Sequence, residues 1–165
     1  MEIAFYVDEM NLRGVANSTF HYAFYNEKIL KNKSIIFFNQ KNHRNRKKVI
    51  LKFKNKFKVI GVNCFKDIDL YKEKLKLNFI YTQKGGKKDE WISSQIKTLV
   101  HYLYPQKLSQ IHGYRYVCVS EWLSKKFSNN KIQFLPYIVE TKKTTSNLRK
   151  KLKIKKSDLV FGCHG

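Results

Sequence analysis

The sequence predicts a doubly wound α/β domain of three layers, with a mostly parallel sheet between two layers of helices. Short apolar runs alternate with segments of helical periodicity along most of the 165 residues, and this alternation is typical of strand–helix–strand units. The apolar runs are continuous, as in strands that a parallel sheet buries on both faces. A chain of this length makes about one domain and can bury roughly 70% of its unfolded surface.

The first unit is a strand at residues 3–7, a polar loop that carries Gly14, and a helix at residues 15–30. Glycine allows the backbone to approach a ligand closely, and the free N–H groups at the start of a helix attract anions such as phosphate. We therefore expect an anion-binding loop around Gly14. The alternative, that Gly14 is only a turn residue, stays open.

The later elements repeat this rhythm. Residues 67–72 begin with Asp67, and a carboxylate suits the N-terminus of a helix. Ser120 follows an apolar run and is a suitable N-cap for a helix at residues 121–127. Further strands are predicted at residues 34–38, 57–61, 78–82, 98–102, 116–119 and 133–140, and a further helix at residues 48–53. The pattern as a whole is that of a Rossmann-like three-layer domain.

The C-terminal part has a different character. Residues 141–147 are polar and lack periodicity, and residues 148–154 read as a lysine-rich helical turn. The segment that starts at Asp158 reads as a strand that runs into a glycine-bearing turn. We expect a domain at residues 1–140 and a linker with a helical turn at residues 141–157. Residues 158–165 are expected to form the first strand of a second, truncated domain.

The formal net charge is +22 at pH 7, from 34 Lys and Arg against 12 Asp and Glu. Such an excess favours binding to polyanions. However, it consists mostly of lysine and accompanies abundant Asn, Phe and Tyr, residue types that share AT-rich codons. Arginine, which binds phosphates and bases in a fixed fork, is rare. We expect a solvated surface with affinity for anionic membranes or phosphorylated ligands, and we keep nucleic-acid binding as an alternative.

Cys64, Cys118 and Cys163 are widely spaced and form no CxxC pair, so we expect reduced thiols rather than a zinc site or a disulfide framework. The N-terminus lacks the long apolar stretch of a signal peptide, and no segment approaches the ~20 apolar residues of a membrane span. We therefore predict a cytoplasmic protein that is soluble or rests on a membrane surface.

Several short segments, in their order along the chain, resemble a known family. They follow the strand that carries His101 and are Val-Ser-Glu-Trp-Leu (119–123), Leu-Pro-Tyr-Ile-Val-Glu (135–140), Asn-Leu-Arg-Lys-Lys-Leu-Lys-Ile (147–154) and Val-Phe-Gly-Cys-His-Gly (160–165). This order resembles the N-terminal half of a GT-B glycosyltransferase of family 4 (group 1). The chain departs from that family at Tyr137 and Ile138, where asparagine and glycine are usual. Gly14 also stands alone where many members carry a glycine pair.

The resemblance implies an enzyme of two Rossmann-like domains that transfers a sugar from a nucleotide-diphosphate sugar to an acceptor in the cleft between them. The N-terminal domain would hold the acceptor, which could be a sugar, a lipid-linked molecule or a protein. The C-terminal domain would bind most of the nucleotide. Neither a cofactor nor a metal is expected, and the 165 residues alone are expected to be inactive.

The same resemblance suggests where the donor and the catalytic group lie. It places Arg13 and Gly14 at the donor phosphate, where a guanidinium and a backbone N–H stabilise the charge of the leaving group. It places His101 at the hydroxyl groups of the sugars, as the catalytic candidate. Ligands approach a doubly wound sheet at the ends of its strands, where His101 is expected. A structural histidine remains the alternative.

Acceptor-binding residues are predicted in the segment that follows the fourth strand. Lys84, Gly85, Gly86 and Lys87 combine an adaptable backbone with positive charge, which suits a phosphate-bearing acceptor. The segment lacks the GxxxxGK[ST] spacing of an ATP-binding loop. His112, just before the sixth strand, could line the same cleft. A solvated turn and a loop histidine without a role remain the alternatives.

A non-catalytic Rossmann-like nucleotide-binding domain is a further alternative. A dinucleotide-binding loop would carry GxGxxG, which is missing from the first loop. A receiver domain would combine an acidic pair, here Asp8 and Glu9, with a phosphoacceptor aspartate at the end of the third strand. That strand ends in Gly61-Val62-Asn63 instead. Neither pattern is complete.

Overall fold

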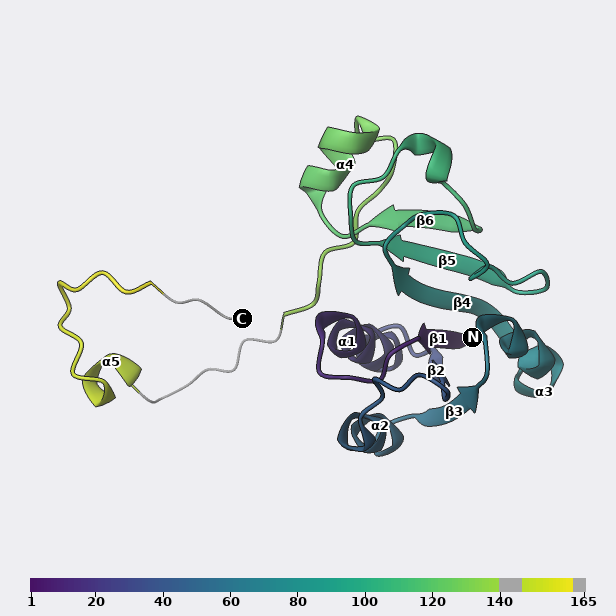
Figure 1. Ribbon diagram of the computed structural model, residues 1–165, viewed down its shortest axis with the longest axis horizontal. Helices are drawn as coiled ribbons and strands as arrows, with labels where there is room; N and C mark the ends of the chain where they lie inside the picture. Colours follow the sequence, from purple (N-terminus) through teal and green to yellow (C-terminus); the bar gives the residue numbers. More distant parts are fainter. Residues whose placement is uncertain (140–146, 162–165) are drawn as a thin grey trace.

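The computed structural model describes residues 1–139 and 147–161, and its centre is a six-stranded, all-parallel sheet (Figure 1). The strands lie in the order β3-β2-β1-β4-β5-β6. They are β1 (Glu2–Val7), β2 (Lys33–Asn39), β3 (Lys58–Val62), β4 (Leu77–Lys84), β5 (Lys97–Tyr102) and β6 (Arg115–Cys118). The predicted α/β class is confirmed, and the order is that of a Rossmann-like domain. Because a receiver-type sheet has the order 2-1-3-4-5, the receiver hypothesis is wrong.

Helices cover both faces of the sheet, as the winding order requires. The α-helices are α1 (Gly14–Lys28), α2 (Lys47–Lys54), α3 (Lys72–Leu75), α4 (Glu121–Ser128) and α5 (Leu148–Lys151), and the 3-10 helices are η1 (Phe65–Tyr71) and η2 (Leu108–Gln110). Ser120 caps α4 as predicted, because its Oγ accepts a hydrogen bond from the backbone N–H of Leu123 at 3.2 Å. The helix expected at residues 67–72 is instead the 3-10 helix η1 followed by the short α3.

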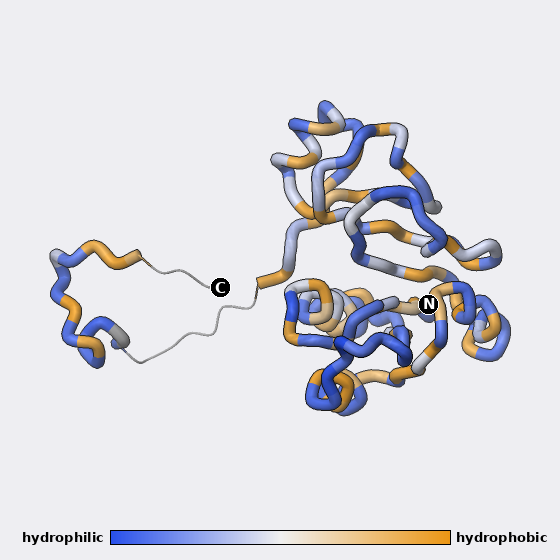
Figure 2. Tube along the Cα trace, in the orientation of Figure 1, coloured by the Kyte–Doolittle hydropathy of each residue, from blue (hydrophilic) through white to orange (hydrophobic). Residues whose placement is uncertain are grey.

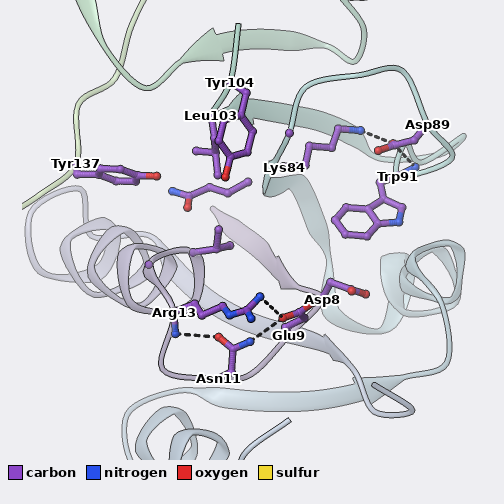
Figure 3. A pocket seen from close by; sticks show the side chains of 14 residues that line it. Asp8, Glu9, Asn11, Arg13, Lys84, Asp89, Trp91, Leu103, Tyr104 and Tyr137 are labelled. Carbon is purple, nitrogen blue, oxygen red and sulfur yellow. Dashed lines mark hydrogen bonds and ion pairs between the residues drawn. The ribbon is translucent and has the colours of Figure 1, made fainter. Parts of the chain in front are cut away.

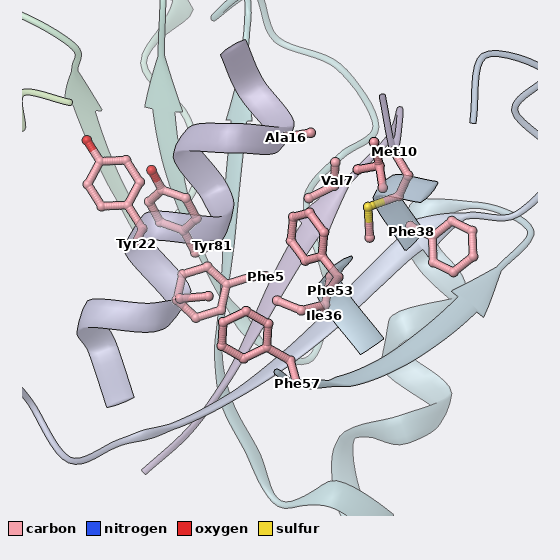
Figure 4. Packing of buried hydrophobic residues seen from close by; sticks show 12 residues of the cluster. Phe5, Val7, Met10, Ala16, Tyr22, Ile36, Phe38, Phe53, Phe57 and Tyr81 are labelled. Carbon is pink, nitrogen blue, oxygen red and sulfur yellow. The ribbon is translucent and has the colours of Figure 1, made fainter. Parts of the chain in front are cut away.

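The continuous apolar runs explain why both faces of the sheet are buried. In β2, Ile36 packs under α1 and α2, whereas its neighbour Ile35 packs on the opposite face with Phe65 and Ile68 of η1. Figure 4 shows the first of these clusters, in which Phe53 of α2 and the rings of the sheet meet. Figure 2 shows how hydropathy varies along the chain, with apolar segments along the strands and many hydrophilic segments in the connecting loops.

The connections after β4 and β5 differ from the helical connections of the first half. Residues 85–96 contain no regular helix, and residues 103–114 contain only the short η2. Side chains hold the backbone of residues 85–96 in place, since the Tyr116 hydroxyl of β6 donates to the Gly86 carbonyl at 2.7 Å and the Gln110 side chain accepts from the Lys88 N–H at 2.9 Å. The connections between β4, β5 and β6 are therefore mostly loops rather than helices.

The strand predicted at residues 133–140 is wrong for the described residues 133–139. Only a single bridge joins Phe134 to Cys118. Beyond it the backbone turns to α1, where the Tyr22 hydroxyl donates to the Pro136 carbonyl at 2.6 Å and the His21 ring lies 3.2 Å from the Ile138 carbonyl. Side-chain contacts from α1, rather than the regular backbone hydrogen bonds of a strand, therefore hold Pro136 and Ile138.

The C-terminal segment is described in part. Residues 140–146, which include the first part of the predicted linker at residues 141–157, and residues 162–165 lie outside the described residues. The helical turn predicted at residues 148–154 is present as α5, while residues 158–161 form no strand. The division into domains stays a prediction. Cys64 and Cys118 are free thiols, and Cys163 lies outside the described part. Within residues 1–139 and 147–161, no helix combines the length and apolar character needed to cross a membrane.

Candidate functional site

A cavity of about 530 Å³ lies where β1, β4 and β5 end. Strand order reverses between β1 and β4, and this is the place where doubly wound sheets bind ligands. Figure 3 shows the side chains around it. Its walls are the loop after β1 (Asp8, Glu9, Asn11, Arg13, Gly14, Val15), the segment after β4 (Gln83, Lys84, Gly85, Asp89, Trp91), and Leu103, Tyr104 and Tyr137.

The loop between β1 and α1 presents a helix start to the cavity. Arg13 is the N-cap in extended conformation, and Gly14 is the first helical residue. The first turn of α1 contains no acidic residue and Arg13 makes no side-chain cap, so the N–H groups of this turn can receive an anion. An added Cβ at Gly14 would meet no atom within 4 Å. The backbone here is thus open to a ligand without any steric need for glycine in the free protein.

Glu9 organises the arginines of this wall. Its carboxylate accepts from Asn11 Nδ2 at 2.7 Å and from Arg44 Nη1 at 2.8 Å, whereas Arg13 Nη1 lies farther away, at 3.9 Å. The Arg13 side chain is 73% exposed. A long, exposed ion pair contributes little to stability. The guanidinium of Arg13 is therefore free to turn toward an anion in the cavity.

Asp8 is held by three neutral donors at the end of β1. Tyr6 Oη donates to its Oδ1 at 3.0 Å, Asn39 Nδ2 donates to the same atom at 3.1 Å, and Asn42 Nδ2 donates to Oδ2 at 3.0 Å. Burial and the nearby Asp8 carboxylate raise the pKa of Tyr6, so the hydroxyl keeps the proton that it donates. These bonds hold the carboxylate in a fixed position without neutralising its charge.

Lys84 brings a buried cation to the opposite wall. Its side chain is 4% exposed and pairs with Asp89, whose Oδ1 also accepts from the Trp91 N–H at 2.9 Å. Burial lowers the pKa of Lys84, and the bond to Asp89 opposes this effect. Figure 3 shows this pair across the cavity from Arg13. The cavity thus has a fixed cation on one wall and a movable one on the other.

A chain of hydrogen bonds leads from the cavity into the protein. Gln83 lines the cavity, accepts from Ser18 Oγ at 2.5 Å and donates to Tyr81 Oη at 2.9 Å. Tyr81 Oη in turn lies 2.6 Å from His101 Nδ1. His101 is fully buried, and burial lowers its pKa to about 4. The imidazole is thus neutral at pH 7 and lies behind the cavity wall rather than in it.

The residues predicted for the site divide into two groups. Arg13, Gly14, Lys84 and Gly85 line the one cavity, whereas Gly86, Lys87, His101 and His112 are not among its walls. His101, which the resemblance places at the sugar hydroxyls, is buried behind the cavity, because its side chain points from β5 toward Tyr81 and Tyr22 in the interior. Its catalytic role stays a prediction.

Gly86 and His112 both lie in tightly packed parts of the fold. Gly86 has a φ of +109°, and an added Cβ would lie 2.7 Å from Cβ of Tyr102. The ring of His112 packs against Tyr116 and hydrogen-bonds through Nδ1 to the Gln110 carbonyl at 2.5 Å, and burial lowers its pKa. Lys87 is exposed. The acceptor-binding roles predicted for these residues stay predictions.

Sequence reasoning missed several walls of the cavity as site residues: Asp8, Asn11, Asp89, Trp91, Tyr104 and Tyr137. The position of Asp8, directly after the first strand of a doubly wound sheet, was a usable signal. Tyr104 and Tyr137 carried no such signal, because they reach the cavity through loop paths that tertiary contacts determine.

A DxD spacing does occur in the chain, at Asp67 and Asp69, but outside this cavity. Asp67 accepts from the backbone of Asn63 at 2.9 Å, and Asp69 accepts from Ser93 and Ser94. The part of the chain that the structure describes contains no group of three His, Cys, Asp or Glu side chains arranged for a metal ion. The expectation that no metal takes part stays a prediction.

Comparisons of the chain with protein-family models, with curated proteins and with solved structures found no match. The structure itself shows a Rossmann-like α/β domain with a cavity of mixed charged and apolar lining at the point where its strand order reverses.

Proposed function

We propose that the chain is the acceptor-side part of a GT-B glycosyltransferase, which moves a sugar from a nucleotide-diphosphate sugar to an acceptor. The observation that carries the proposal is the convergence of Arg13, the start of α1 and the carboxylate of Asp8 on one cavity. In this reaction the bond between the anomeric carbon and the diphosphate breaks, and a bond to an acceptor oxygen forms. The diphosphate leaves with additional negative charge, and the acceptor hydroxyl loses its proton.

The leaving diphosphate would be stabilised at the start of α1. The first turn of α1 contains no acidic residue that would compete for its backbone N–H groups. The exposed Arg13 can add a charge-assisted hydrogen bond to the diphosphate. Such donors are most effective where charge develops during the reaction. This agrees with the role that the family resemblance implies for Arg13 and Gly14.

The acceptor would lie nearer to the centre of the cavity. Hydroxyl groups of a sugar need both hydrogen-bond acceptors and donors, which Asp8, Asn11 and Gln83 supply. Trp91 and Tyr137 contribute apolar ring surface to the same walls. Asp8 is the carboxylate best placed to accept the proton of the attacking hydroxyl, because its position is fixed by three donors.

A non-catalytic nucleotide-binding domain is the second candidate, because the strand order 3-2-1-4-5-6 is also that of dinucleotide-binding domains. The two candidates differ in what the cavity binds. A transferase domain binds both a nucleoside diphosphate and a sugar acceptor, whereas a nucleotide-binding domain needs no site for a free sugar.

The test is a titration of the isotope-labelled chain followed by NMR. Uridine and guanosine diphosphates should shift the amide signals of Gly14 and Val15, and oligosaccharides should shift those of Gln83 and Gly85. Full-length protein should release the nucleoside diphosphate from a nucleotide sugar when an acceptor is present. Nucleotide shifts without sugar shifts or turnover would favour the second candidate. The absence of both kinds of shift would refute both.

A further inference from the structure

We propose that the protein docks on an anionic phospholipid bilayer through the edge of the sheet at which the strands begin. This edge lies opposite the cavity, because all six strands are parallel and the cavity is at their other end. The proposal goes beyond the proposed function and does not depend on it. It rests on a row of basic residues and on an apolar groove beside that row.

The basic row follows from the positions at which the strands begin. Lys33, Lys58, Lys97 and Arg115 are the first residues of β2, β3, β5 and β6, and Lys76 directly precedes β4. All five are exposed. Neighbouring strands lie about 4.8 Å apart, so the row extends roughly 24 Å across the six strands. Separate parts of the sequence thus contribute to one continuous basic edge.

Few carboxylates balance this row. Lys33 pairs with Glu2 at 3.3 Å, and Glu27 and Glu73 also lie near this edge. Lys58, Lys76, Lys97 and Arg115 form no ion pair within residues 1–139 and 147–161. At the opposite edge, by contrast, the cations of the cavity have carboxylates nearby, since Arg13 lies 3.9 Å from Glu9 and Lys84 pairs with Asp89. The positive charge of the basic row is therefore mostly uncompensated within the described residues.

The apolar groove opens on the face of the sheet that α1 covers only in part. It measures about 390 Å³ and is lined by Ile3 and Leu99 of the sheet, Tyr22 of α1, and Ile29 and Leu30 just after that helix. Ile29 is 64% exposed and Leu30 is 66% exposed. Exposed aliphatic side chains beside an apolar groove indicate a surface that another apolar phase covers.

The groove and the basic row meet at β5. Lys97 is two residues before Leu99 and therefore on the same face of that strand. Its Nζ lies 4.6 Å from the ring centre of Tyr114, and the guanidinium of Arg115 lies 5.5 Å from the same ring. An apolar surface bordered by tyrosine and basic residues matches the boundary between lipid chains and phosphates.

Charge and side-chain type select the bilayer among possible partners. A second copy would bring two basic edges together, and like charges repel. A nucleic acid would favour arginine, whereas four of the five basic residues of this row are lysine and the most exposed side chains beside the groove, Ile29 and Leu30, are aliphatic. Lysines attract anionic headgroups, and aliphatic side chains insert below them.

The test is co-sedimentation with vesicles of phosphatidylcholine alone or mixed with phosphatidylglycerol. We expect strong binding to the mixed vesicles and weak binding to phosphatidylcholine. The triple variant Lys58→Gln, Lys97→Gln, Arg115→Gln should lose about a hundredfold in partitioning to the mixed vesicles, since each basic residue near the surface contributes about fivefold. Leu30→Ser should lower binding to both vesicle types, because it removes aliphatic surface.

The matched control is Lys41→Gln, Lys107→Gln, Lys126→Gln, which removes the same charge from exposed positions outside the basic row. Its partitioning should stay within about threefold of the unchanged protein if placement matters more than net charge. Circular dichroism should show that all variants are folded. Equal binding to both vesicle types, or equal losses in the two triple variants, would overturn the proposal. So would a random oligonucleotide that binds this edge more tightly than the mixed vesicles do.

Discussion

Arg13 and Lys84 lie on opposite walls of one cavity, but only Lys84 is fixed in place. Lys84 is buried and paired with Asp89, whereas Arg13 is largely exposed and 3.9 Å from Glu9 (Figure 3). An ion pair of a buried lysine mainly holds structure, whereas an exposed guanidinium is available to a ligand. Removal of the Arg13 side chain should therefore weaken ligand binding, whereas loss of the carboxylate that pairs with Lys84 should lower the stability of the fold.

Arg13→Ala should weaken diphosphate binding by about tenfold to a hundredfold, the range expected for loss of a hydrogen bond to a charged group. The unfolding free energy should change by less than about 0.5 kcal/mol, because the ion pair is exposed. Calorimetric titration and urea unfolding measure the two quantities. Arg44→Ala is the control, since Arg44 also pairs with Glu9 but does not line the cavity. Equal losses of affinity in both variants would contradict the role of Arg13.

Asp89→Asn should destabilise the fold by about 1–3 kcal/mol, because it leaves the buried ammonium of Lys84 without its carboxylate. The pKa of Lys84 should fall further, since the bond to Asp89 raises it. Glu90→Gln removes the neighbouring charge from an exposed pair with Lys66 and should change stability by less than about 0.5 kcal/mol. Urea unfolding measures the stability of the two variants. Equal unfolding free energies would show that the pair of Lys84 and Asp89 stabilises the fold no more than the exposed pair of Lys66 and Glu90.

Gly14→Ala and Gly86→Ala should separate a ligand-facing glycine from a structural one. At Gly86 the φ of +109° and the approach to Tyr102 predict a loss of about 1–3 kcal/mol in unfolding free energy. At Gly14 an added methyl group would meet no protein atom within 4 Å, so the stability of the fold should be kept. Diphosphate affinity should fall, because the methyl group would keep the ligand from approaching the backbone closely. Unchanged affinity of folded Gly14→Ala would support the alternative that this glycine is only a turn residue.

The strands could be predicted closely because their apolar runs are continuous and end at polar loops. The rule that ligands bind where strands of a doubly wound sheet end led to Lys84 and Gly85, whereas Gly14 followed from a glycine loop before a helix and Arg13 from the family resemblance. It failed for His101, which lies near the end of β5 but points into the core. At a strand end, side chains alternate between the two faces, so position along the sequence does not decide which of them reach a cavity.

The remaining errors came from contacts between distant segments. The run at residues 133–140 has the composition of a strand, yet the hydrogen bond from Tyr22 to the Pro136 carbonyl draws it across α1. The same path brings Tyr137 to the cavity. Local propensity contains no information about such a contact, which depends on the side chain of a residue far away in the sequence.

His101 should make stability depend on pH. Its folded pKa of about 4 lies below the ordinary value of 6.5, so between these values the unfolded chain binds the proton and the folded chain does not. Stability should therefore fall as the pH is lowered from about 6.5 to 4, by about 3 kcal/mol in total. Urea unfolding of His101→Asn should show a smaller fall, because asparagine does not titrate. His43→Asn, at an exposed position, should keep the fall of the unchanged protein.

Under the proposed function, Asp8→Asn should reduce sugar transfer by about a hundredfold to ten-thousandfold, the range for loss of a general base. An amide is close in shape to a carboxylate and still offers an oxygen to Tyr6, but it takes up no proton. Affinity for the nucleoside diphosphate should stay unchanged, because that ligand is assigned to the start of α1. Glu9→Gln is the control for charge, since Glu9 also lines the cavity but its carboxylate binds Arg44 and lies near Arg13. If the two variants lose equal activity, or if Asp8→Asn weakens nucleotide binding instead, Asp8 contributes only to the charge of the cavity.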